Sequence, residues 1–115
     1  MSEGSPKRLI VGITGASGLV VGVRLLELLK ETGIETHLVM SKAAEMALAY
    51  ETDLQPKQVR ALASVNHAVT ALGASISSGS FPTMGMVIAP CSIRTMSEIA
   101  TGATSSLLTR AADVV

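Results

Sequence analysis

A nearly unbroken apolar run ends in a glycine-rich turn close to the start of this chain. Residues 8–14 (RLIVGIT) are mostly β-branched and aliphatic, which is typical of a strand buried on both faces of a parallel sheet. The turn is Gly15-Ala16-Ser17-Gly18, and apolar residues then recur at helical spacing as far as Thr32. This strand–turn–helix unit constrains the fold strongly, because such a strand needs other elements on both of its faces.

The same alternation of apolar runs and helical patterns continues along the chain. We expect strands at residues 8–14, 35–40 and 84–89, and helices at residues 18–32, 41–50, 56–63, 93–100 and 107–115. Residues 64–82, rich in Ser, Gly and Ala, are expected to be irregular. This order predicts an α/β fold, a three-layer αβα sandwich of the Rossmann-like or flavodoxin-like kind with a parallel sheet.

Composition predicts a single domain and narrows the classes of partner. Of 115 residues, 48% are apolar, and the 9 basic residues balance the 9 acidic ones, so neither nucleic acid nor an anionic membrane is an expected partner. No apolar run approaches the ~20 residues that span a bilayer. A single cysteine favours a cytoplasmic protein. Zero net charge with a mean hydropathy of +0.48 favours self-association.

The two ends of the chain differ in character. Residues 1–6 are small and polar and are predicted to be a disordered leader, so that the domain comprises residues 7–115. Residues 111–115 (AADVV) carry no helix stop signal and end on apolar side chains. We therefore expect a domain that is truncated at its C-terminus.

The first turn has the pattern of a phosphate-binding loop. Residues 12–18 (GITGASG) place glycines at i, i+3 and i+6, so that backbone N–H groups and a helix N-terminus can meet a phosphate, with Ser17 adding a hydroxyl. A P-loop is excluded because Leu19 follows the last glycine. A dinucleotide is disfavoured because residues 40–42 (MSK) lack the acidic residue that binds ribose. A mononucleotide phosphate fits better, and a plain tight turn remains the alternative.

A second loop, Pro90 to Thr95, follows the third expected strand. Ligands of open α/β sheets bind at the carboxyl ends of the strands, so this loop and the first should face one crevice. Ser92 and Thr95 occupy the N-cap and N3 positions of the next helix, which suits either ligand oxygens or ordinary capping. Cys91 is not expected to be a nucleophile, because no histidine lies near it in the sequence.

Other polar residues allow both a functional and a structural interpretation. Residues 77–80 (SSGS) could wrap a second phosphate or form only a linker. Glu51 could be an acid or base, or a solvent-exposed carboxylate. His37 and His67 are expected to be structural or solvent-facing, and no metal-binding cluster is evident.

Several segments together resemble the flavin prenyltransferase family of the UbiX/Pad type, formerly described as aromatic acid decarboxylases. They are KRLIVGITGASG, THLVMSKAAE, SSGSF, GMVIAPCSIRT and LLTRAADVV, in this order between residues 7 and 115. TGASG alone is common, but its combination with APCS and RAADV is specific. The chain is more distantly similar to flavin-dependent cysteine decarboxylases, which share the fold and the mode of FMN binding.

The resemblance implies a set of site residues. FMN would be held by Gly15, Ala16, Ser17, Ser41, Ser92, Ile93, Arg94 and Thr95. Ser17 and Glu51 would handle protons near flavin N5. Ser78 and Gly79 would face the phosphate of dimethylallyl monophosphate, and Arg110 would bind it by charge-assisted hydrogen bonds.

The resemblance also implies an activity. Family members join a dimethylallyl group to N5 and C6 of reduced FMN without a metal, and a UbiD-type decarboxylase uses the product. They form trimer-based homo-oligomers, up to dodecamers, with the flavin pocket between subunits. The family pattern continues beyond Val115 with further residues of the prenyl-phosphate pocket.

Two alternatives remain open. One is an FMN-dependent decarboxylase of the cysteine-decarboxylase family, which would favour a catalytic histidine near the end of the first helix; residues 32–35 contain none. The other is a truncated, non-catalytic FMN-binding module.

Overall fold

The computed structural model describes residues 7–115, so the expected leader at residues 1–6 lies outside the described residues. A parallel four-stranded sheet forms the centre of the molecule, with strand order β3-β2-β1-β4. The strands are β1 (Arg8–Ile13), β2 (Glu35–Met40), β3 (Val65–His67) and β4 (Met86–Ile88).

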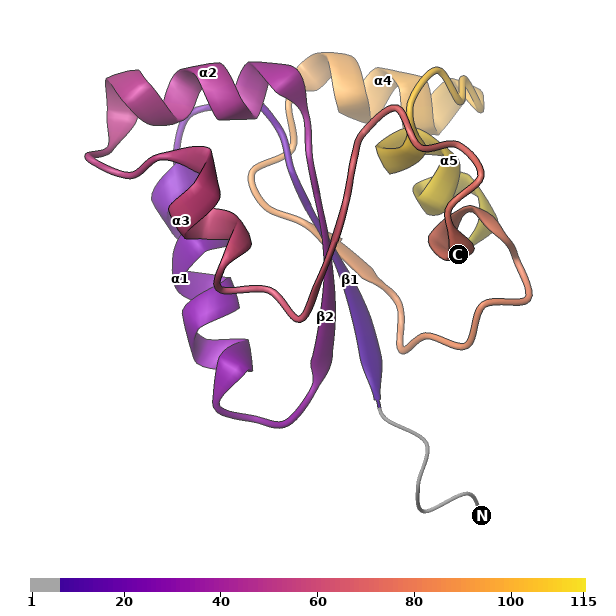
Figure 1. The fold of residues 1–115 in the computed structure, drawn as a ribbon. Helices are drawn as coiled ribbons and strands as arrows, with labels where there is room; N and C mark the ends of the chain where they lie inside the picture. Colours follow the sequence, from indigo (N-terminus) through magenta and orange to yellow (C-terminus); the bar gives the residue numbers. More distant parts are fainter. Residues whose placement is uncertain (1–6) are drawn as a thin grey trace.

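Helices cover both faces of this sheet (Figure 1). The helical elements are α1 (Leu19–Lys30), α2 (Lys42–Glu51), α3 (Pro56–Arg60), the 3-10 turn η1 (Ser75–Ser77), α4 (Ile93–Thr101) and α5 (Leu107–Val114). In Figure 1, α1 and α3 lie on one side of β1 and β2, and α5 lies on the other. The expected αβα sandwich with a parallel sheet is therefore confirmed.

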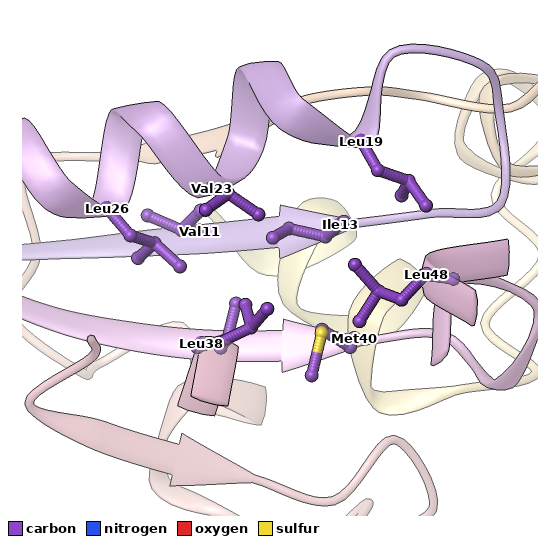
Figure 2. Close-up of a cluster of buried hydrophobic side chains, with 10 residues drawn as sticks. Val11, Ile13, Leu19, Val23, Leu26, Leu38, Met40 and Leu48 are labelled. Carbon is purple, nitrogen blue, oxygen red and sulfur yellow. The ribbon is translucent and has the colours of Figure 1, made fainter. Parts of the chain in front are cut away.

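Alternate side chains of β1 and β2 enter two separate cores. Val11 and Ile13 of β1 and Leu38 and Met40 of β2 pack against Leu19, Val23 and Leu26 of α1 and Leu48 of α2, as Figure 2 shows. Ile10, which precedes Val11, and Val39, which lies between Leu38 and Met40, point to the opposite face. There they pack against Ile76, Leu107, Leu108 and Ala111. A strand with apolar residues at successive positions is thus buried on both faces, as its sequence indicates.

The edge strand β3 was not predicted. Val65 to His67 lies in the segment expected to be irregular, and it pairs in parallel with residues 37–39 of β2. Three residues are too few to show a periodic pattern, and only Val65 has high β propensity. The strand forms because β2 offers a free edge, so the expectation of three strands is corrected to four.

Across the described part of the chain, none of the helices is both long and apolar enough to cross a membrane.

Candidate functional site

The carboxyl ends of β1, β2 and β4 lie at one edge of the sheet because the strands are parallel and adjacent. Figure 1 shows that α2 and α4 both lie at this edge. The loops here enclose a cavity of about 410 Å³. It is lined by Gly15, Ser41, Lys42, Ala43, Val69, Ser92, Arg94, Thr95, Glu98, Ser105, Ser106, Leu108 and Thr109. The two loops that the sequence placed in one crevice therefore do share a cavity.

Two helices present their N-termini at this cavity, and each is capped by a serine. Ser41 Oγ accepts a hydrogen bond from Ala44 N at 3.1 Å, and Ser92 Oγ accepts one from Thr95 N at 3.1 Å. The earlier N–H groups of each first turn have no acceptor within their own helix. These N–H groups and the positive ends of two helix dipoles make this edge suitable for an anion.

Charged side chains at the cavity include both signs. Lys42 and Arg94 contribute cations, whereas Glu98 contributes a carboxylate. Glu98 Oε1 accepts a hydrogen bond from Ser105 Oγ at 2.8 Å, and Glu98 Oε2 accepts one from Arg94 Nε at 3.0 Å. The hydrogen bonds from Ser105 and then Arg94 lower the pKa of Glu98. Glu98 therefore holds Arg94, which is otherwise exposed to solvent.

Gly15 brings the first loop against α2. A Cβ atom at Gly15 would lie 2.6 Å from the Cβ of Ala43, so only glycine allows the loop to approach the start of α2 this closely. Ala16 and Ser17, the other loop residues assigned to FMN, are not among the residues that line the cavity. The side chain of Ile93 is 86% exposed, so this residue can contribute through its backbone.

The start of α1 is satisfied by Glu51 rather than left open for a phosphate. Glu51 Oε1 accepts hydrogen bonds from Gly18 N at 3.0 Å and Leu19 N at 3.4 Å. The carboxylate comes from the end of α2 and supplies the negative charge that a helix N-terminus favours. Two of the N–H groups that the glycine turn was expected to offer to a phosphate are therefore already used. The same contacts hold Glu51 at Gly18, the residue that follows its expected catalytic partner Ser17.

The residues expected to bind the second substrate lie away from this cavity. Ser78 and Gly79 line another cavity of about 460 Å³, together with Phe81 and the last residues of α5. Arg110 lies beside them, since its Nε donates to the backbone carbonyl of Ser77 at 3.3 Å. The three residues are thus near one another, but none of them lines the cavity that contains Ser41 and Ser92.

Several residues of the site were not assigned by sequence reasoning. Thr14, at the end of β1, donates from Oγ1 to the Pro90 carbonyl and accepts from Ser92 N. Ser106 caps α5, where Ser106 and Thr109 form a reciprocal capping box that a Ser-x-x-Thr pattern could have indicated. Lys42 and Glu98 had no sequence signal, because solvated helix surfaces also carry such residues.

The thiol of Cys91 is poorly suited to act as a nucleophile. Cys91 is half-buried, and burial raises the pKa of its thiol, which reduces the thiolate fraction. Within residues 7–115, no three His, Cys, Asp or Glu side chains are placed to hold a metal ion.

The comparison with curated proteins finds flavin prenyltransferases. The chain is 62% identical over 110 residues to the flavin prenyltransferase UbiX of Escherichia coli strain K12, and the match covers 95% of this chain and 58% of that protein. The chain thus spans little more than half the length of this relative.

Solved structures with the same fold extend this result. The crystal structure of AnUbiX in complex with FMN and dimethylallyl pyrophosphate is 44% identical with a TM-score of 0.94, covering 96% of this chain and 58% of that one. A dodecameric FMN-dependent UbiX-like decarboxylase from Escherichia coli O157:H7 is 49% identical with a TM-score of 0.92, covering 94% of this chain and 60% of that one. The resemblance to the UbiX type is thereby confirmed.

A family model described as "Flavoprotein" matches residues 1–115. Together with the cavity at the carboxyl edge of the sheet, this match over the whole sequence means that the chain belongs to the flavoprotein family.

Proposed function

We propose that this chain is the FMN-binding part of a flavin prenyltransferase. The enzyme would join a dimethylallyl group from dimethylallyl monophosphate to N5 and C6 of reduced FMN. One observation carries the proposal: a single cavity is lined by Gly15, Ser41, Ser92, Arg94 and Thr95. These are positions that the UbiX-type motifs assign to the flavin.

The residues at the cavity fit a flavin phosphate. The capped N-termini of α2 and α4 supply backbone N–H groups, and Lys42 and Arg94 supply positive charge. Glu98 already holds Arg94, so an incoming phosphate would compete with this carboxylate for the guanidinium. Because Glu51 occupies the start of α1, we place the phosphate at α2 and α4 rather than in the glycine turn.

Reduced FMN supplies the nucleophilic N5 and C6 atoms when it is bound. The role of the chain is to orient the flavin, to exclude water and to move protons near N5. We assign this proton handling to Ser17 and Glu51; Glu51 accepts a hydrogen bond from the backbone N of Gly18, the residue that follows Ser17. Departure of the phosphate from an allylic carbon needs no metal, since fixed charges and dipoles can stabilise the developing cation.

The prenyl-phosphate site needs a second contribution. Ser78 and Gly79 line another cavity of this copy, and Arg110 lies beside them. We propose that these three residues complete the flavin site of a neighbouring copy in a homo-oligomer. The dodecameric relative supports such an assembly. We further propose a cytoplasmic location and transfer of the product to a UbiD-type decarboxylase.

The test is a titration with two flavins followed by turnover. The fluorescence of each flavin should be quenched when it binds. FMN should bind with higher affinity than riboflavin, which lacks the phosphate. Anaerobic incubation with reduced FMN and dimethylallyl monophosphate should then yield FMN heavier by one dimethylallyl group, detected by mass spectrometry.

The outcomes separate the alternatives. FMN binding without a prenylated product from this chain, where a full-length relative yields one, would indicate the non-catalytic FMN-binding module. Decarboxylation of a cysteine-containing peptide would indicate an FMN-dependent enzyme of the cysteine-decarboxylase family. Failure to bind either flavin would refute the proposal.

A further inference from the structure

One buried hydroxyl connects the ends of β1 and β4. Thr14 is 1% exposed, and its Oγ1 donates to the Pro90 carbonyl at 2.7 Å and accepts from Ser92 N at 2.6 Å. The backbone N of Thr14 donates to the same carbonyl at 3.1 Å. A single residue of the first loop therefore holds both sides of the turn that precedes α4.

The single oxygen of a hydroxyl can make both contacts at once. It donates one hydrogen bond and accepts others, whereas an aliphatic side chain does neither. Ser92 is the N-cap of α4, so fixing its backbone N–H also fixes where the first N–H groups of this helix point. Those N–H groups belong to Ile93 and Arg94, beside the cavity.

The opposite side of this turn is held by a close approach of α1. A Cβ atom at Gly22 would lie 2.2 Å from the backbone oxygen of Ala89, a distance at which the helix or the turn would have to move. The Ala89 N–H donates to the Gly12 carbonyl at 2.9 Å, which continues the pairing of β4 with β1. The turn is therefore clamped between Thr14 and Gly22.

We propose that Thr14 is a positioning residue for the phosphate end of the flavin site. It acts through Ser92, by setting the distance and direction between the β1 loop and the N-terminus of α4. The expected effect of Thr14 on flavin affinity rests on the proposed FMN binding. The clamping of the turn by Thr14 does not depend on that proposal.

The experiment compares Thr14→Val, which keeps the shape and removes the hydroxyl, with Thr14→Ser, which keeps the hydroxyl. The first readout is amide hydrogen exchange at residues 92–94 without ligand. We expect faster exchange in Thr14→Val and exchange as in the unsubstituted protein in Thr14→Ser. Equal exchange in all three proteins would overturn the proposal, whether or not the chain binds flavin.

The second readout is flavin affinity. Thr14→Val should weaken FMN binding by about tenfold, as expected for one or two hydrogen bonds, and should change riboflavin binding much less. Thr14→Ser should stay within about twofold of the unsubstituted chain for both flavins, since its hydroxyl keeps the contacts. Equal losses for FMN and riboflavin would indicate a general loss of structure and would contradict a role at the phosphate.

A second variant covers the case in which Thr14→Val does not fold. Gly22→Ala displaces the same turn from the side of α1 and leaves the hydroxyl in place. It should also increase exchange at residues 92–94 and weaken FMN more than riboflavin. If Thr14→Val and Gly22→Ala, or the one of them that folds, leave amide exchange at residues 92–94 unchanged, the turn is not clamped between Thr14 and Gly22. If the unsubstituted protein binds no flavin while exchange responds as expected, only the proposed function fails.

Discussion

At the scale of single residues, Glu51 has a role that its position in the sequence did not reveal. It lies at the end of α2, yet its carboxylate satisfies two backbone N–H groups at the start of α1. The expected proton chemistry and this structural contact involve the same carboxylate. The two roles can be separated experimentally, because an amide oxygen can still accept the hydrogen bonds but is a much weaker base.

We predict that Glu51→Gln retains FMN binding and slows prenylation. The amide keeps an acceptor for Gly18 N, whereas loss of a positioned acid–base group typically costs ~10²–10⁴-fold in rate. Ser17→Ala should behave in the same way. The measurement is the rate of prenylated product in a full-length protein, with FMN affinity measured in parallel.

Glu31→Gln is the matched control for this prediction, since it changes an exposed carboxylate at the other end of α1. Wild-type rates in both Glu51→Gln and Ser17→Ala would show that proton handling lies elsewhere. Loss of FMN binding in Ser17→Ala alone would instead assign Ser17 to the flavin cradle.

At the scale of elements, two histidines join the edge strand to the sheet. His37 is 4% exposed, and its Nε2 lies 2.7 Å from Glu35 Oε1 while its Nδ1 lies 2.9 Å from His67 Nε2. A carboxylate only accepts, so His37 Nε2–H donates to Glu35 and His37 Nδ1 accepts from His67 Nε2–H. Arg8 Nε also donates to Glu35. The expectation of structural histidines agrees with this arrangement.

We predict that acid weakens the fold through His67. Burial, with a smaller effect from the charge of His37, lowers the pKa of His67 below its ordinary value of 6.5. The unfolded chain therefore binds the proton more readily, so the free energy of unfolding should fall as the pH falls below about 6.5. Protonating both rings would also set two N–H donors against each other across the contact between His37 and His67.

His67→Gln should make the free energy of unfolding less dependent on pH between about 7 and 5, measured by urea denaturation. The hydrogen bond from His37 lowers the pKa of Glu35 below 4.5, so the stability that Glu35 contributes is lost only at lower pH, outside this window. Asn66→Gln, at the exposed neighbouring position, is the control and should retain the original slope. An unchanged slope in His67→Gln would refute the assignment.

At the scale of the whole molecule, apolar surface remains uncovered. Val20, Val21 and Leu28 of α1 are between 50% and 63% exposed, and Met46 and Tyr50 of α2 are 67% and 87% exposed. Solvent-exposed apolar side chains in this number favour burial against other copies. The positions of Ser78 and Gly79, away from the proposed flavin site of the same copy, agree with a site shared between subunits.

We predict that the protein sediments as a homo-oligomer at micromolar concentration. Association would bury apolar surface that otherwise contacts water, and zero net charge removes long-range repulsion between copies. Sedimentation velocity over a hundredfold dilution range measures this directly. A full-length relative serves as the control, and a single monomeric species in both proteins would contradict the prediction.

Features that depend on neighbouring residues could be predicted from the sequence. Buried strands are recognisable as apolar runs. Ser41 and Ser92 indicate where helices begin, because an N-cap residue binds backbone N–H groups within the first turn of its helix. The shared edge of the first and third predicted strands follows from parallel topology. The fold class and the grouping of Gly15 with Ser92 were therefore predictable, whereas Ser41 was assigned to the same site only by the family resemblance.

Contacts between residues far apart in the chain could not be predicted, because they form only when the elements pack together. Thr14 meets Pro90 and Ser92, Glu51 meets Gly18, and His37 meets His67. β3 exists because β2 presents a free edge, and Ser78 lies away from the flavin cavity because η1 packs beneath α5. Each outcome depends on how the packing of helices and strands brings separated segments together. The local spacing of residues in the sequence does not predict which distant residues will meet.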